Sequence, residues 1–167
     1  MKNLILTLLI LSLNFFTYGQ EITDIRFEHQ NGVLFEFGGN GYSINYERIL
    51  INMNEFKFSS QLGISYYPPS TSIRVIWLPT SITGIWSFGK HHLELGVGYI
   101  FIREALRDSV NNTVGWHWTE IFTSRLGYRY QVPNKHFIMR VGYIPSIELE
   151  NNKEFHSAVG LSFGYSF

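Results

Sequence analysis

The last thirteen residues of the chain, 155–167, constrain the fold more than any other segment. They read FHSAVGLSFGYSF, and nearly every second position from Phe155 to Phe167 is apolar or aromatic, whereas small and polar residues stand between them. Strict alternation is typical of a β-strand whose two faces meet different surroundings. Chain ends usually fray, so such an apolar terminal strand predicts a sheet that holds the last residue in place.

Alternation of period two occurs in seven earlier segments as well, so the sequence predicts an all-β protein. We expect eight strands, at residues 33–39, 41–49, 56–67, 73–88, 92–102, 116–130, 137–147 and 155–167. Short turns at 52–54, 89–91 and 132–135 alternate with longer polar connections at 68–72, 103–114 and 148–154. An even number of strands with short turns at one end and longer loops at the other predicts an up-and-down antiparallel transmembrane β-barrel.

The two faces of the predicted strands differ in the way that a membrane barrel requires. One face collects glycine, serine and seven charged residues, namely Glu36, Glu47, Lys57, Glu94, Arg125, Arg129 and Arg140. On the lipid face an Arg or Lys would cost ~2–4 kcal/mol at the bilayer midplane, whereas an eight-stranded interior has room for side chains alone. We therefore predict that these residues form an ion network that fills the lumen; a proton or solute path is the less favoured interpretation.

Pro79 lies inside the predicted strand 73–88. A proline cannot donate to the hydrogen-bond ladder, and a closed barrel has no free edge on which to place it. We expect a bulge or a bend beside Pro79, and the inward and outward positions of this strand stay unassigned.

The N-terminus indicates export. Lys2 precedes an apolar run from Leu4 to Phe16 that is too short to span a membrane as a helix, which needs ~20 residues. We expect a signal peptide at 1–19, a polar lead-in at 20–31 and a barrel at 32–167, located in the outer membrane of a Gram-negative cell.

Composition excludes several classes of protein. The chain has 13 basic and 13 acidic residues and no cysteine. A neutral chain offers no positive field for nucleic acid, and a chain without cysteine has neither a disulfide framework nor a lipid-anchor cysteine.

No enzyme motif is evident in the sequence. The six histidines lack metal-ligand spacing, and we interpret His91, His92 and His136 as surface turn residues, so no metal and no cofactor are expected. His156 and Ser157 are adjacent and therefore point to opposite faces of their strand. The His-x-Ser spacing of lipid A deacylases is absent. A lipid-modifying barrel enzyme and a secreted lipocalin-like binder remain as alternatives.

The longest predicted outer loop is the best candidate for contact with a surface ligand. Its candidate contact residues are Arg103, Arg107, Asp108, Trp116 and Trp118.

Several segments resemble a known family. They are GYSINYERIL at 41–50, HLELGVGY at 92–99, LGYRYQ at 126–131, FIMRVGYIP at 137–145 and the closing GLSFGYSF. The chain resembles the small, mostly uncharacterised outer-membrane β-barrels of Bacteroidetes-type bacteria, which are OmpX-like. The resemblance implies contact with outer-membrane lipid and lipopolysaccharide, and insertion by the barrel-assembly machinery. The insertion signal would be Phe163, Tyr165 and Phe167. The resemblance supplies no activity and no catalytic residues. Our hypothesis is a non-enzymatic protein with a role in envelope structure or in surface adhesion through the extracellular loops.

Overall fold

The computed structural model describes residues 26–38, 41–66, 75–107, 113–149 and 154–167. Its strands are β1 (Asn31–Gly38), β2 (Tyr42–Asn52), β3 (Phe56–Tyr66), β4 (Val75–Phe88), β5 (His91–Arg107), β6 (Thr113–Gln131), β7 (Phe137–Glu148) and β8 (Phe155–Ser166). The predicted signal peptide at 1–19 and most of the lead-in lie outside the described residues. No helix in the described ranges is long and apolar enough to cross a membrane.

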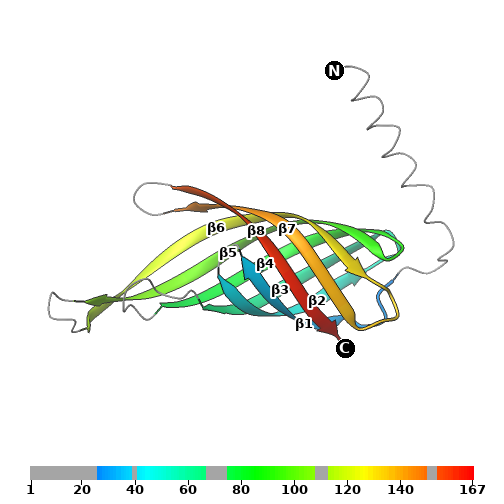
Figure 1. The fold of residues 1–167 in the computed structure, drawn as a ribbon, viewed down its shortest axis with the longest axis horizontal. Coiled ribbons are helices and arrows are strands. Elements are labelled where there is room, and N and C mark those ends of the chain that lie inside the picture. Colours follow the sequence, from blue (N-terminus) through cyan, green and yellow to red (C-terminus); the bar gives the residue numbers. More distant parts are fainter. Residues whose placement is uncertain (1–25, 39–40, 67–74, 108–112, 150–153) are drawn as a thin grey trace, which may run out of the picture.

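The eight strands form one closed antiparallel barrel (Figure 1). Each strand pairs with the next along the chain, and β1 pairs with β8 to complete the ring. The predicted up-and-down barrel of eight strands is confirmed.

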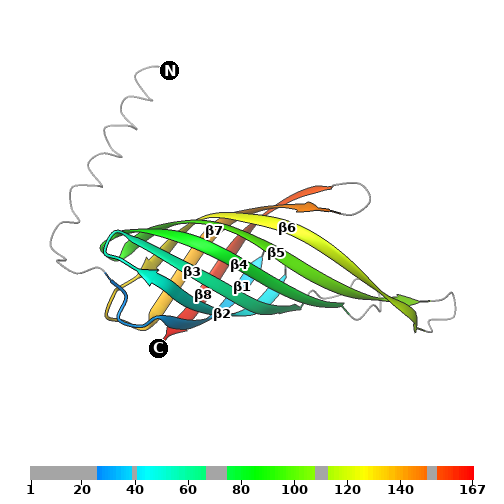
Figure 2. The same ribbon diagram turned by 180° about the vertical axis from the view of Figure 1, so that it is seen from behind.

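The barrel has two different ends. One end, here called the turn end, carries the connections at 53–55, 89–90 and 132–136 together with the C-terminus (Figure 1). At the opposite end, the loop end, β5–β6 and β7–β8 project beyond the rest of the barrel, as both views show (Figures 1 and 2).

The structure corrects the prediction of a long loop at residues 103–114. The β5–β6 ladder continues outward until Arg107 faces Thr113, with one register shift beside Arg107. Arg103, Trp116 and Trp118 therefore lie on strands, whereas Asp108 falls outside the described residues. The backbone bonds of two long neighbouring strands satisfy each other even beyond the closed part of the barrel, so polar sequence alone does not end a strand.

The bulge predicted at Pro79 is also wrong. Leu62 pairs with Thr80 and Ser65 pairs with Trp77, so the β3–β4 register is the same on both sides of the proline. The ladder between these two pairs is interrupted, and this gap accommodates the missing N–H without an extra residue. Because the register does not shift, the inward and outward positions of β4 follow the same parity on both sides of Pro79.

The exterior is apolar and the interior is polar. Ile44, Ile64 and Val159 are 60%, 65% and 64% exposed, whereas Lys57 and Arg129 are 0% and 1% exposed. A soluble lipocalin-like binder would show the opposite arrangement. The interior is also crowded, because a Cβ added at an inward glycine such as Gly96 would lie 2.7 Å from the Thr83 hydroxyl oxygen.

Candidate functional site

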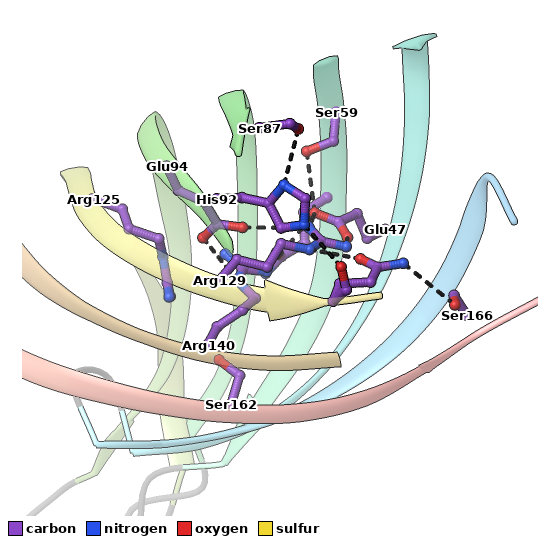
Figure 3. Close-up of polar contacts among 12 residues, drawn as sticks. Glu47, Ser59, Ser87, His92, Glu94, Arg125, Arg129, Arg140, Ser162 and Ser166 are labelled. Atoms are coloured by element: carbon purple, nitrogen blue, oxygen red, sulfur yellow. Dashed lines mark hydrogen bonds and ion pairs between the residues drawn. The ribbon is translucent and has the colours of Figure 1, made fainter. Parts of the chain in front are cut away.

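Four charged side chains meet in the middle of the barrel, and we call them the central quartet: Glu47, Glu94, Arg129 and Arg140 (Figure 3). Arg129 contacts Glu47 (Nη2–Oε2 2.8 Å) and Glu94 (Nη1–Oε1 3.3 Å). Arg140 contacts Glu94 (Nε–Oε2 3.0 Å) and Glu47 (Nη1–Oε1 3.8 Å). Each carboxylate therefore lies between the same two guanidinium groups.

The sheet register explains why the quartet assembles. Arg129 and Arg140 are direct cross-strand partners on β6 and β7, where two like charges would repel. Glu94 lies opposite Gly127 on β6, and Gly127 lies opposite Gly142 on β7. A Cβ added at Gly127 would lie 3.6 Å from Glu94 Oε2, so the absence of a side chain there leaves room for this carboxylate. Glu47 reaches the arginines from β2, across the lumen. The pairing therefore joins opposite walls of the barrel.

Neutral hydrogen bonds complete the coordination of the quartet. Ser59 Oγ donates to Glu47 Oε1 (3.1 Å), Arg129 Nε donates to Gln131 Oε1 (2.8 Å) and Arg140 Nη1 donates to Gln61 Oε1 (2.9 Å). Buried ions recover their desolvation cost only when such bonds satisfy the remaining donors and acceptors. The quartet therefore links four strands, β2, β5, β6 and β7, and its bonds to Ser59 and Gln61 add β3.

A second ion pair, Glu36 with Arg125, lies nearer the loop end. Ser162 Oγ donates to the same carboxylate (Oε2, 2.7 Å). A cavity of about 50 Å³ beside the pair is lined by Glu36, Arg125, Asn45 and other polar residues. This volume suits ordered water, whereas ligand pockets measure ~300–1,000 Å³.

Lys57 lies nearer the turn end than the quartet. Its ammonium donates to the Asn54 carbonyl (2.9 Å) and to Ser87 Oγ (2.7 Å). His92 is 1% exposed and contacts Ser87 Oγ through Nδ1 (2.9 Å) and the Gln131 carbonyl through Nε2 (2.9 Å). The interpretation of His92 as a surface turn residue is therefore wrong. The alternation that points Glu94 inward also points His92 inward, and this signal was present in the sequence.

Phe27 closes the turn end from the inside, and sequence reasoning missed it. Its side chain is 2% exposed, with Lys57 Nζ 4.8 Å and Arg129 Cζ 5.2 Å from the ring centre. The ring also packs edge-on against His92 at 5.0 Å. Asn52 fixes the Phe27 backbone, because its Oδ1 accepts from the Phe27 N–H (3.0 Å) and its Nδ2 donates to the Phe27 carbonyl (2.7 Å). Phe27 lies in a short, mostly polar segment outside the predicted strands, so the strand pattern did not indicate this contact.

The predicted contact residues are only partly brought together. The Arg103 guanidinium lies over the rings of Trp116 (4.4 Å) and Trp118 (5.5 Å) on the outer surface. Arg107 is the last residue of β5. The residues of the predicted insertion signal, Phe163, Tyr165 and Phe167, point outward and are 39%, 55% and 53% exposed.

The described residues do not assemble a catalytic or metal site that we recognise. His156 is exposed beside Glu154 (3.7 Å), and Ser157 follows it on the opposite face of β8. Within the described ranges, no group of three or more His, Cys, Asp or Glu side chains could hold a metal ion.

Comparisons with known proteins agree with the fold. No protein-family model and no curated protein matches the sequence. The closed ring of eight strands with a polar interior defines the class as an outer-membrane-type β-barrel. A solved structure of this class, the N-terminal β-barrel domain of Pseudomonas aeruginosa OprF, is similar with a TM-score of 0.53 and 16% identity. The similarity covers 84% of this chain and 100% of that chain, and it concerns the fold alone.

Proposed function

We propose that the protein is a non-enzymatic barrel of the Gram-negative outer membrane that contributes to envelope structure and to surface contact. The observation that carries this proposal is the distribution of side chains, with apolar residues on the outside and charged residues inside, the reverse of a soluble barrel. Outward side chains such as Ile64 and Val159 are more than half exposed, whereas the charges point inward. In water such an exterior would aggregate; in a bilayer it is the favourable arrangement.

Three layers of contacts support a lumen closed to solutes. The Glu36–Arg125 pair, the central quartet and Phe27 follow one another from the loop end to the turn end. The cavity beside the Glu36–Arg125 pair has only the size of a few water molecules, at about 50 Å³. We therefore infer a structural role for the interior, and we expect no conductance steps when the protein is reconstituted into planar lipid bilayers.

The projecting β5–β6 hairpin is the part of the molecule suited to contact with other surfaces. Its ladder runs as far as Arg107 and Thr113, beyond the closed barrel. In the proposed orientation the loop end faces the outside of the cell, the turn end faces the periplasm, and residues 1–19 direct export. This arrangement is that of the small barrels of Bacteroidetes-type bacteria that the sequence resembles.

Membrane fractionation of cells that express the chain tests the proposal. We expect the protein in the outer-membrane fraction, with an unheated gel band that migrates faster than the boiled one, because closed barrels resist detergent. Protease added to intact cells should cut within residues 104–117 and spare the turn end. Recovery of the protein in the soluble periplasmic fraction would refute the membrane location.

A further inference from the structure

The outer surface of the β5–β6 hairpin carries a cation held by two indole rings. Arg103 pairs across the ladder with Trp118 and lies diagonal to Trp116, and its Cζ is 5.5 Å and 4.4 Å from their ring centres. Both tryptophans are about half exposed, at 51% and 49%. Cation–π contact of this kind fixes the orientation of a guanidinium group.

The position of Arg103 along the barrel places this cluster at the border of the apolar belt. Leu93, Leu95, Val97, Tyr99 and Phe101 occupy the preceding outward positions of β5. At ~3.3 Å per residue and a tilt of ~40°, the stretch from Leu93 to Phe101 rises roughly 20 Å, which approaches the ~25 Å belt of membrane barrels. Arg103 is the next outward residue of β5. In the orientation given under the proposed function, on which this inference rests, it lies at the headgroup level of the outer leaflet.

The guanidinium group of Arg103 has a hydrogen-bond donor without a partner among the described residues. Within the described part of the chain, its Nε is buried without a hydrogen-bond partner. The outward neighbour Glu120 faces Phe101 on the ladder and makes no ion pair with Arg103 among the described residues. A buried donor without a partner is costly, so a shift of the Arg103 side chain that brings its Nε to an anionic oxygen would be favourable.

We propose that Arg103, Trp116 and Trp118 bind the phosphate group of an outer-leaflet lipid. A guanidinium group binds phosphate with two parallel charge-assisted bonds, and indole rings favour the membrane interface. The acyl chains of the lipid would lie along the apolar belt below, beginning at Phe101 and Tyr99. This continuity with the belt favours a lipid phosphate over free phosphate.

Native mass spectrometry of the full chain, released from phosphatidylcholine nanodiscs, tests the site. The nanodiscs contain either bisphosphorylated lipid A or the same lipid A without its phosphates. We expect the wild-type protein to retain the phosphorylated form about tenfold more often, and we expect Arg103→Gln to abolish this preference. Arg103→Lys keeps the charge but loses the planar fork, so it should retain only part of the preference.

Arg48 provides the matched control. It is exposed on the outer face of β2 near the turn end, with no ring contact or ion pair among the described residues. Arg48→Gln should retain the wild-type preference. Equal retention by Arg103→Gln and wild type, or no preference in the wild type, would overturn the site, as would loss of the lipid upon addition of inorganic phosphate.

The heat-modifiable gel band distinguishes a failure of the lipid site from a failure of the proposed function. If Arg103→Gln shows the heat-modifiable band and still prefers phosphorylated lipid, the lipid site is refuted and the membrane barrel stands. If the wild-type protein fails to fractionate with the outer membrane, the proposed function is refuted even where lipid binding in nanodiscs depends on Arg103.

Discussion

At the scale of single residues, the central quartet shows how an eight-stranded barrel tolerates buried charge. Its two arginines and two glutamates are each almost fully buried, and every carboxylate contacts both guanidinium groups. Burying an ion costs several kcal/mol, and this cost is offset only where all partners are present. The loss of one member should therefore be much more costly than the loss of a surface charge.

Glu94→Gln tests this reasoning. The amide cannot compensate Arg129 and Arg140, which face each other across the β6–β7 ladder, so one acid would remain for two arginines. We expect the free energy of unfolding to fall by about 3–5 kcal/mol, measured by urea titration in lipid vesicles with the gel shift as readout. Glu55→Gln, at an exposed position of the turn 53–55, is the control and should change it by less than about 0.5 kcal/mol. Equal losses in both variants would contradict the prediction.

The pairing of charges could not be predicted from the sequence, although their common face could. Period two places Glu47 and Arg129 on the same side of their strands. Whether the two side chains meet depends on the stagger of β2 relative to β6, on the opposite wall, and this stagger is a property of the closed ring. Phe27 illustrates the same limit, because its partners Lys57 and Arg129 come from distant parts of the sequence.

At the scale of elements, the sequence predicts where strands exist better than where they end. The strand predicted to end at Ile102 continues to Arg107, because a projecting hairpin has polar residues on both faces and resembles a loop. At Pro79 the opposite error occurs: a proline that suggested an irregular strand is accommodated by a gap in one ladder. In both cases the outcome depends on pairing with the neighbouring strand. The residue pattern of one strand carries no information about that pairing.

The described part of the lead-in before β1, residues 26–30, has no regular structure, and the Asn52 side chain binds it at Phe27. Asn52→Asp keeps the oxygen that accepts from the Phe27 N–H but replaces the donor that serves the Phe27 carbonyl by a second oxygen. We expect the amides of residues 27–30 to exchange about tenfold faster in hydrogen-exchange mass spectrometry, because the loss of one such bond is worth roughly 1 kcal/mol or more.

Asn134→Asp is the matched control for this prediction. Asn134 is exposed in the turn 132–136, at the same end of the barrel, so the substitution adds the same charge without touching the Asn52–Phe27 contacts. Exchange that is equally fast in both variants would indicate a general effect of charge and would contradict the role given to Asn52.

At the scale of the whole molecule, the backbone of the closing strand seals the barrel, and we propose that its terminal side chain serves as an insertion signal. The backbone of Phe167 exchanges two hydrogen bonds with Asn31 (3.2 and 2.8 Å), which seals the ring at the turn end. Its side chain points away from the barrel and is 53% exposed. The roles of the backbone and the side chain can be tested separately, because a substitution of Phe167 removes the ring and leaves the backbone hydrogen bonds in place.

Phe167→Ala makes this separation measurable. We expect the purified variant to unfold within about 1 kcal/mol of wild type, whereas its amount in the outer-membrane fraction of expressing cells should fall several-fold, because the terminal aromatic is proposed to be read during insertion. Phe137→Ala removes a ring of similar exposure, 51%, at the start of β7 and should leave that amount unchanged. An equal fall in both variants would show that apolar surface, and not the terminal signal, controls insertion.

The pairing of β1 with β8 also sets an order of events in time. Asn31 and Phe167 stand at opposite ends of the described chain, so the seam can form only after the last residue is available. Until then β1 and whichever strand was formed last present unpaired edges, which are templates for aggregation. Contacts between residues so distant in the chain also form slowly. A protein built this way spends its most vulnerable period as an open sheet, and its survival depends on what shields those two edges before they meet.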